Sequence, residues 1–452
     1  MSSVLVVGGG LAGSEAAWQL AEAGHEVRLV EMRPVRATPV HHGDGLAELV
    51  CSNSLRGDDL ANAVGLLKRE MECLGSVVMG AARAAAVPAG SALAVDRERF
   101  SAGVGGVLGR HPRIDVVREE IIALPTGPAI LATGPLTSPA LHAALEAQLG
   151  EGSLAFFDAI APIVAADSLD HERLFRASRY GKGGGEDYLN AAMDRAEYDA
   201  FVAALLAAER VPLKAFESER VRYFEGCLPI EVMAERGADT LRYGPMKPVG
   251  LIDPRSGRRP WAVVQLRQDD LAAEHWNLVG FQTKLTFAAQ QAVFRRIPGL
   301  ERARFVRFGM IHRNTFVNAP AHVDRELRLV SRPDLRLAGQ LTGVEGYVES
   351  AATGLLAARM LAAELAGAVA PPVARDTAHG GLVRHLTERL PTGFQPANIS
   401  WGLIVCPEEL AGVRDKGRRR ALQAERALDA IRSWGEATPG ASPAAVRAAL
   451  SQ

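Results

Sequence analysis

The chain has 452 residues, of which 48% are hydrophobic and 23% are charged, and its formal net charge at pH 7 is −1. This composition is ordinary for a globular protein with one large or two ordinary hydrophobic cores, and it excludes a chain-wide positive field that would attract nucleic acid. No uninterrupted apolar run is long enough to span a bilayer, and the first residues lack a charged and then apolar leader, so we expect a cytoplasmic protein.

The first thirty-one residues form the most informative segment. An apolar strand over Ser3–Val7 leads into a glycine turn over Gly8–Gly13, and an Ala/Leu-rich helix is predicted over Ser14–Ala23. A second predicted strand, Val27–Val30, ends on Glu31. The order of strand, glycine turn, helix, strand and acid is typical of a dinucleotide-binding unit.

Each part of that unit has a physical task. Gly8 permits the tight turn, Gly10 lets the backbone approach a pyrophosphate, and Gly13 lets the helix pack closely on the strand. The free N–H groups at the start of the helix favour the phosphate charge. Glu31 follows at the spacing expected for a carboxylate that binds a ribose hydroxyl.

Four cysteines are widely spaced, at Cys51, Cys73, Cys227 and Cys406. They form no CxxC pair, so the sequence predicts neither a zinc site nor a disulfide framework, and a reducing compartment fits. An isolated cysteine is by default a small buried hydrophobic residue. Adjacent histidines in a Pro/Gly loop, His41-His42 near Asp44, make a poor metal cage, so we expect no metal.

The chain returns to its first domain after an insertion. A strand over Ala129–Ala132 runs into Thr133-Gly134-Pro135, after which helices and short strands alternate. A later strand, Leu335–Gly339, and a helix, Leu355–Leu365, are expected to complete the first sheet and to bring a second helix N-terminus near the cofactor. We therefore predict four parts: 1–139 and 306–370 as the two halves of a cofactor domain, 140–305 as an inserted substrate or tRNA domain, and 371–452 as a C-terminal helical extension.

The inserted and C-terminal parts carry further predicted elements. We expect helices over Ala196–Glu209 and Phe287–Arg296, strands over Ala262–Leu266 and Asn277–Phe281, a linker over Ala366–Ala374, a basic run over Arg414–Arg420, and a last short helix capped by Ser442-Pro443. The basic run either follows a tRNA backbone or forms a solvated helix face.

Several motifs together resemble one family, the folate- and FAD-dependent tRNA (uracil-5-)-methyltransferases, TrmFO. The motifs cover nearly the whole chain: Gly8–Gly13, Glu31–Pro34, Val50–Leu55, Ala94–Arg97, Ala132–Leu136, Phe224–Glu231, Gly244–Leu251, Gln265–Arg267, Val279–Thr283, His312–Thr315 and Ala338–Gly354. The glycine turn is common to many flavoproteins. The Cys-Ser-Asn-Ser, Gly-Cys-Leu-Pro-Ile-Glu and Gly-Val-Glu-Gly-Tyr segments are much more specific.

The resemblance implies a fold, a cofactor and a reaction. The fold would be α/β, with a Rossmann-like, glutathione-reductase-like FAD-binding domain, an inserted α+β domain and a C-terminal helical extension. FAD would carry a methylene group from 5,10-methylenetetrahydrofolate to C5 of uridine 54 in the tRNA T-loop, and NADPH or NADH would reduce the flavin. The oligomeric state stays open between a monomer and a weak dimer.

The resemblance also implies site residues. The cofactor-binding residues would be Gly8, Gly9, Gly10, Leu11, Ala12, Gly13, Glu31, Arg33, Gly339, Gly346, Tyr347, Ser350 and Ala351. Cys227 is expected to attack C6 of the uracil and Cys51 to act as a flavin-side acid/base or protective thiol, although these two roles are interchangeable. Cys73 and Cys406 are then expected to be core residues.

Other charged groups have two interpretations each. Glu345 and Glu349 flank Gly346-Tyr347 at the second helix start, where they either face the cofactor or cap the helix. Lys247, Arg267 and His312-Arg313 either bind folate carboxylates or tRNA phosphates or are solvated surface charges.

Three other functions compete with this one. The nearest is a flavin-dependent modifier of the tRNA wobble uridine, of the glucose-inhibited-division-protein-A type, but those proteins carry a larger C-terminal helical domain. The second is a small-molecule FAD oxidoreductase, which would not need the two cysteine motifs. The third is a non-catalytic flavin-containing RNA-binding protein.

Overall fold

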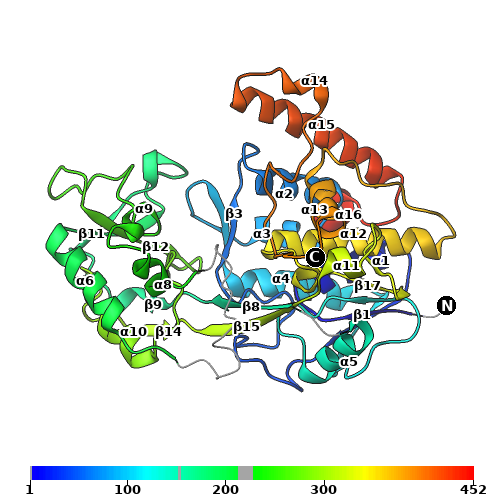
Figure 1. The fold of residues 1–452 in the computed structure, drawn as a ribbon, viewed down its shortest axis with the longest axis horizontal. Coiled ribbons are helices and arrows are strands. Elements are labelled where there is room, and N and C mark those ends of the chain that lie inside the picture. Colours follow the sequence, from blue (N-terminus) through cyan, green and yellow to red (C-terminus); the bar gives the residue numbers. More distant parts are fainter. Residues whose placement is uncertain (1–2, 151–153, 212–227, 452) are drawn as a thin grey trace.

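The computed structural model describes residues 3–150, 154–211 and 228–451, which form two sheet-based regions joined by a two-stranded ribbon (Figure 1). The first region is built on a six-stranded sheet. In spatial order its strands are β16 (Arg328–Leu329), β17 (Arg332–Leu337), β7 (Ala129–Leu131), β1 (Val4–Val7), β2 (Val27–Glu31) and β6 (Ile114–Arg118). All neighbours are parallel except β16 and β17.

The late part of the chain completes the first sheet, as the sequence predicts. Strand β17 pairs in parallel with β7, with Leu335 opposite Ala129 and Leu337 opposite Leu131. Strands β1 and β7 are largely buried apolar runs, as expected for parallel strands covered on both faces, whereas β17 is buried only in its second half, Leu335–Leu337. Their carboxyl ends therefore meet at one edge, where ligands bind in sheets of this kind.

Two helices cross closely above that edge. Helix α1 (Leu11–Glu22) follows the glycine turn and helix α12 (Tyr347–Leu365) follows β17. A methyl group on Gly354 would lie 2.1 Å from the Ala12 carbonyl oxygen, so only glycine allows the helices to approach this far. Helix α1 starts at Leu11, earlier than the predicted Ser14, because Gly10 serves as its N-cap.

Other elements of the first region surround these helices. They are β3 (Ser54–Gly57), α2 (Ala63–Cys73), α3 (Val77–Ala84), β4 (Ala86–Val87), β5 (Ala92–Val95), α4 (Arg97–Arg110), α5 (Pro139–Leu149), α11 (Ala319–His322) and the 3-10 turn η4 (Gly339–Thr342). Strands β3, β5 and β4 form a small antiparallel sheet.

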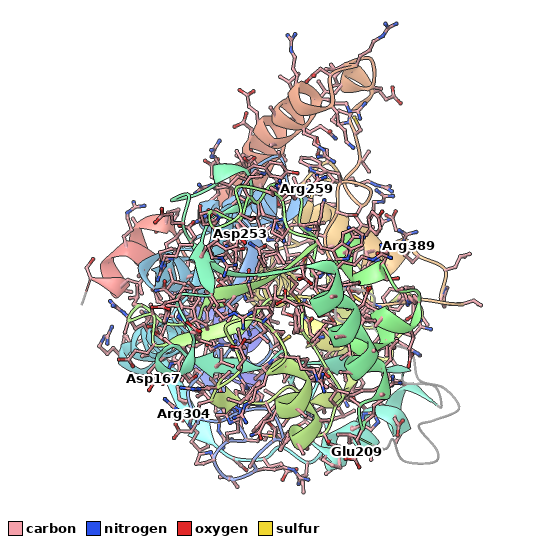
Figure 2. The ribbon with its side chains drawn as sticks, turned by 90° about the vertical axis from the view of Figure 1, so that its left-hand side faces the viewer. Asp167, Glu209, Asp253, Arg259, Arg304 and Arg389 are labelled. Atoms are coloured by element: carbon pink, nitrogen blue, oxygen red, sulfur yellow. The ribbon has the colours of Figure 1, made fainter. Side chains whose placement is uncertain are left out.

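The second region is built on an antiparallel sheet with a core of its own. Its strands, in spatial order, are β10 (Leu174–Arg176), β11 (Tyr188–Met193), β12 (Ala262–Gln268), β13 (His275–Leu278), β9 (Ile163–Ala165) and β14 (Phe305–Arg307). Its helices are η1 (Ala166–Ser168), η2 (Arg179–Gly181), α6 (Arg195–Ala207), α8 (Ile230–Glu235), α9 (Thr240–Tyr243) and α10 (Phe287–Phe294). Figure 2 faces this region, where the exposed ion pair of Asp167 and Arg304 closes at 2.7 Å.

The predicted elements of this region are found with small shifts. Helices α6 and α10 and strand β12 match their predictions. The strand predicted over Asn277–Phe281 lies earlier, at His275–Leu278, because Gly280 takes a positive φ of 80° and turns the chain away.

Two strands connect the regions. Strand β8 (Leu154–Ala159) and strand β15 (Ile311–Phe316) pair antiparallel along their full length. This ribbon fits an insertion that leaves and re-enters the first region at one place. The division points near residues 139, 305 and 370 stay a proposal.

The C-terminal helices are α13 (Ala378–Glu388), α14 (Glu408–Ala411), α15 (Lys416–Glu436) and α16 (Pro443–Leu450), the last capped by Ser442 as predicted. Helices α13, α15 and α16 contribute residues to the first core, whereas α14 has no buried residue. Buried Arg359 of α12 donates to the carbonyl oxygens of Gly435, Thr438 and Ala441 and so fixes this end of the chain.

One buried histidine makes the stability of this packing depend on pH. His385 of α13 is 4% exposed, lies 5.0 Å from the Phe394 ring, and has a pKa lowered to about 4, chiefly by burial. The unfolded chain takes up a proton near pH 6.5 while the folded chain does not, so stability falls as the pH drops from about 6.5 towards 4.

We therefore expect His385→Gln to weaken this pH dependence. Wild type should lose about 2 kcal/mol of unfolding free energy between pH 7 and pH 5 through this group, and the variant should not. Urea unfolding at both pH values measures the difference. The exposed His171→Gln variant is the control and should follow wild type; an unchanged pH dependence in His385→Gln would contradict the assignment.

Candidate functional site

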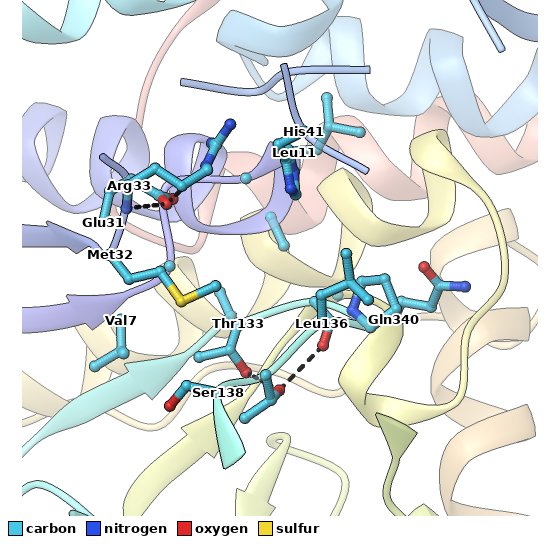
Figure 3. A pocket seen from close by; sticks show the side chains of 18 of the residues that line it. Val7, Leu11, Glu31, Met32, Arg33, His41, Thr133, Leu136, Ser138 and Gln340 are labelled. Carbon is cyan, nitrogen blue, oxygen red and sulfur yellow. Dashed lines mark hydrogen bonds and ion pairs between the residues drawn. The ribbon is translucent and has the colours of Figure 1, made fainter. Parts of the chain in front are cut away.

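A first cavity of about 1000 Å³, open to solvent, lies at the carboxyl ends of β1, β2, β7 and β17. Figure 3 shows how side chains from distant segments meet in it. It is lined by Val7, Gly8, Gly10, Leu11, Ala12, Glu31, Met32, Arg33, His41, Thr133, Leu136, Ser138, Gly339, Gln340, Tyr347 and Ser350, among others. This size and largely apolar lining suit a cofactor.

The glycine turn has the geometry that the sequence predicts. Gly8 has a φ of 103°, and a methyl group on Gly13 would lie 1.8 Å from the Gly8 carbonyl oxygen. A methyl group on Gly10, in contrast, would meet no atom of the described residues within 4 Å. Gly10 therefore borders free space in front of the α1 N-terminus, where a pyrophosphate fits.

Glu31 stands beside this turn as an ionised acceptor. One carboxylate oxygen accepts the Gly9 N–H at 2.8 Å, and the other accepts the Arg33 backbone N–H and side-chain Nε at 3.0 and 2.9 Å (Figure 3). Burial alone would raise the pKa of Glu31, but the hydrogen bonds and charge of Arg33 lower it overall. These bonds fix the Glu31 side chain, and the carboxylate can still accept a further hydrogen bond from a hydroxyl group.

The side chain of Arg33 donates its hydrogen bonds to other protein groups. It is 3% exposed and donates to the carbonyl oxygens of Gly43 and Gly45 and to the Glu48 carboxylate at 2.6 Å. Arg33 therefore clamps the loop that closes one side of the cavity.

His41 is a cavity residue that the sequence did not single out for cofactor binding. Its Nδ1 lies 2.6 Å from Thr38 Oγ1, and burial together with the charge of Arg33 lowers its pKa to about 4. A neutral imidazole therefore faces the cavity at pH 7. His41 lies in a loop and belongs to no motif, so no sequence pattern identifies it as a cofactor contact.

A second cavity, with about 1120 Å³ of empty space, adjoins the first. The two share Val50, Pro135, Gln340 and Tyr347. The second cavity is also lined by Cys51, Ser52, Ser54, Arg56, Ala161, Arg267, Asn277, Val279, Gly280, Gln282, Asn314, Glu345, Gly346 and Asn398. It thus lies where the segment after Val50, the start of α12 and the inserted sheet converge.

Cys51 is fixed by Tyr347. The phenol oxygen accepts the backbone N–H groups of Cys51 and Ser52 at 2.7 and 3.1 Å. Burial, then the charge of Cys51, raises the pKa of Tyr347, so the phenol keeps its proton.

Two arginines surround the cysteine. Arg267 donates to Ser52 Oγ at 2.7 Å and to Asn53 Oδ1 at 2.8 Å, and its charge and that of Arg97 act on Cys51. Of the two interpretations of Arg267, solvated surface charge is wrong, because the residue is 6% exposed.

The start of α12 is held by a buried ion pair. Glu349 bonds to Arg56 and accepts the Ile399 N–H at 2.8 Å, and its second carboxylate oxygen has no partner among the described residues. Glu345 accepts from Gln340 at 2.5 Å. Neither carboxylate caps the helix, whose N-cap is Gly346 with a φ of 106°.

The other predicted residues divide into two groups. Gly9, Gly13 and Ala351 do not line the first cavity, and Ala351 is fully buried within α12. Gly346 lines only the second cavity. Cys227 and the side chains of His312 and Arg313 lie outside the described residues.

The prediction for Cys406 is wrong. Cys406 is exposed rather than part of the core, because it precedes the short helix α14 on the surface, whereas Cys73 packs against the first core as predicted.

Among the described residues, no group of three or more His, Cys, Asp or Glu side chains is arranged to hold a metal. Within residues 3–150, 154–211 and 228–451, no helix is long and apolar enough to cross a bilayer.

The fold and its cavities define a class of flavoprotein. Residues 3–368 match the family model described as Glucose inhibited division protein A. Among solved structures, GidA of Aquifex aeolicus is similar with a TM-score of 0.68 at 16% identity, covering 96% of this chain and 74% of that one. This likeness confirms the Rossmann-like α/β fold.

Curated relatives narrow the family. Proteins named methylenetetrahydrofolate--tRNA-(uracil-5-)-methyltransferase TrmFO are 58% identical in Anaeromyxobacter sp. and 56% identical in Rhizorhabdus wittichii. The alignments cover 95% of this chain and 96% and 97% of those relatives. The chain therefore belongs to the TrmFO family, within the wider family of glucose inhibited division protein A.

The glycine turn offers a direct test of the first cavity. We expect Gly10→Ala to keep the melting temperature, because its methyl group meets no protein atom, and to bind FAD about tenfold or more weakly, because that group fills the space for the pyrophosphate. Flavin titration of the apoprotein measures this. The control is Gly109→Ala, at an exposed position of α4, where the added methyl group also meets no atom of the described residues; this variant should bind FAD as wild type does. Wild-type FAD affinity in Gly10→Ala would contradict the assignment.

Proposed function

We propose that this protein transfers a one-carbon unit from 5,10-methylenetetrahydrofolate to C5 of a uridine in the tRNA T-loop and thereby forms 5-methyluridine. The observation that carries the proposal is identity above one half over 95% of the chain to relatives named for this activity. Two adjoining cavities, one suited to a dinucleotide and one beside a cysteine, support it.

The residues of the first cavity fit FAD. The open space at Gly10, the N-terminus of α1 and the ionised Glu31 suit a pyrophosphate and a ribose hydroxyl. FAD, when bound and reduced by NADPH or NADH, would pass on the electrons and carry the one-carbon unit. Gln340 and Tyr347, which line both cavities, would then face the cofactor and the substrates together.

The chain supplies positioning and proton handling in the second cavity. Uracil C5 is a poor nucleophile until a thiolate adds to C6, and a base must then remove the C5 proton. Cys227 is proposed as the thiolate. Cys51, held by Tyr347 and surrounded by positive charge, is proposed as the acid/base or protective thiol.

NADPH or NADH is proposed as the source of electrons. The sequence carries no second glycine fingerprint, so the nicotinamide cofactor would bind transiently near the flavin.

The wobble-uridine alternative is less well supported. This chain covers 74% and 78% of the two GidA structures, and their 16% and 17% identity speaks to the fold alone. A small-molecule oxidoreductase would need neither the second cavity beside the first nor the cysteine motifs.

The basic run at the start of α15 is proposed to bind the tRNA backbone. Arg414, Lys416 and Arg418 are exposed, and the first turn of α15 holds no acidic residue. Cations at a helix N-terminus oppose the helix dipole, so they do not serve stability there. Figure 1 shows α14 and the start of α15 standing out from the body, and Figure 2 shows the side chains of this end directed outward.

We expect methylation to depend on Cys51 and Cys227 but not on Cys406. Cys51→Ala and Cys227→Ala should each lower tRNA methylation by roughly a hundredfold or more, because a reacting group is lost. Exposed Cys406→Ala is the control and should keep full activity. Incorporation of labelled methylene into T-loop 5-methyluridine measures the rate, and full activity in both variants would rule out the thiolate mechanism.

A second measurement assigns the nucleophile. T-arm RNA with 5-fluorouridine at the target should form a covalent adduct, because fluorine cannot leave C5 as a proton. Only the variant that lacks the attacking thiol should fail to form this adduct. Label at the wobble base instead of the T-loop would contradict the proposed substrate.

The basic run should contribute to the salt dependence of tRNA binding. Replacing Arg414, Lys416 and Arg418 together by glutamine should weaken binding and lower the slope of log affinity against log salt by about one per lost contact. Arg426 and Arg432, on the same helix but paired with carboxylates, are the matched control. An unchanged slope in the triple variant would exclude this surface.

A further inference from the structure

Two carboxamides in the wall of the second cavity lack hydrogen-bond partners. Asn314 is fully buried, and neither its Oδ1 nor its Nδ2 has a partner within the described chain. Asn277 is 2% exposed, and its Nδ2 has none. Leaving a buried polar group unpaired costs about 1–3 kcal/mol, so such groups at a cavity wall indicate a ligand that pairs with them.

Rigid elements hold both side chains in place. Asn314 lies in strand β15, opposite Phe156 of β8. Asn277 lies in β13 directly opposite Arg267 of β12, so the two side chains share one face of the sheet. Arg267 in turn bonds to Ser52 and Asn53, next to Cys51. The two carboxamides therefore face the same cavity as the cysteine.

The chemistry of a carboxamide limits what it recognises. Its C=O accepts and its NH₂ donates, so one asparagine pairs in bidentate fashion with an adjacent N–H donor and C=O acceptor. Because both ends of Asn314 are free, either orientation of its amide presents this pattern. A lactam ring edge, with N–H beside C=O, is the complement, and a carboxylate or phosphate, which only accepts, is not.

We propose that Asn314, assisted by the Asn277 amide, binds the lactam edge of a planar heterocycle in the second cavity. This inference rests on the proposed function, whose two substrates each carry such an edge: the pterin ring of the folate and the target uracil. Arg267 and Gln282 line the same cavity and limit the orientation of the ring.

Direct binding measurements on the flavin-loaded protein test this proposal without turnover. The probes are tetrahydrofolate and two T-arm RNA hairpins, one with the target uridine and one abasic at that position. Asn314→Leu keeps the side-chain size but removes the pairing. It should either weaken tetrahydrofolate binding by about tenfold or erase the difference between the two hairpins. The first result assigns the pterin edge and the second the uracil edge.

Controls separate recognition from folding. Asn318→Leu removes a nearby carboxamide that bonds to Pro391 and lines neither cavity, so it should bind all probes as wild type does. Flavin content and melting temperature report folding, and Asn314→Ser replaces Asn314→Leu if the latter loses either. Asn277→Leu should give a smaller loss on the same probe.

Two outcomes would be distinct failures. Wild-type affinity for tetrahydrofolate and an unchanged hairpin difference in Asn314→Leu would overturn this inference while leaving methylation intact. A wild-type protein that binds the probes but methylates no tRNA would overturn the proposed function, and the lactam assignment would still be decided by binding.

Discussion

The close crossing of α1 and α12 is the constraint on which the rest of the structure depends. Gly354 allows the α12 backbone to rest on the Ala12 carbonyl group, and Gly13 allows α1 to rest on the turn at Gly8. Because α12 follows β17 through the short turn η4, this contact brings Tyr347 at the start of α12 to the cavity that the glycine turn begins. A larger residue at either glycine would separate the two helix starts, and the site would lose one wall.

The position of the inserted region is set by hydrogen bonds around the cysteine segment. Asn53 donates to the carbonyl oxygens of Val95 and Gln268 at 2.9 Å each and accepts from Arg267. Arg97 pairs with Asp269 at 2.9 Å. These contacts join the first region to β12 of the inserted sheet immediately beside Cys51. The same contacts therefore determine the shape of the second cavity and the position of Cys51, since a shift between the two regions would change both.

The sequence predicted the parts of this site that are local. The glycine turn, the acid after β2 and the return of the chain at Leu335 each have a short pattern with a physical cause, and all three are found. Arg33 was expected at the cofactor, yet its clamp on Gly43 and Gly45 depends on a loop whose path no period describes. Asn277 and Asn314 come from different strands and meet only through the tertiary fold. The exposure of Cys406 was missed because a lone cysteine carries no position-specific signal.

The unpaired groups of the second cavity show why such residues escape sequence reasoning. A folded chain normally pairs its buried polar atoms, and here Asn53, Arg267 and Gln265 do so with partners in the protein. Asn314 and Asn277 line the second cavity, are buried, and keep polar atoms that have no partner among the described residues. Stability alone would favour apolar side chains at these positions, because such atoms destabilise the fold by about 1–3 kcal/mol each. These unpaired polar side chains therefore oppose folding locally, as residues of functional sites often do. They line the same cavity as Cys51.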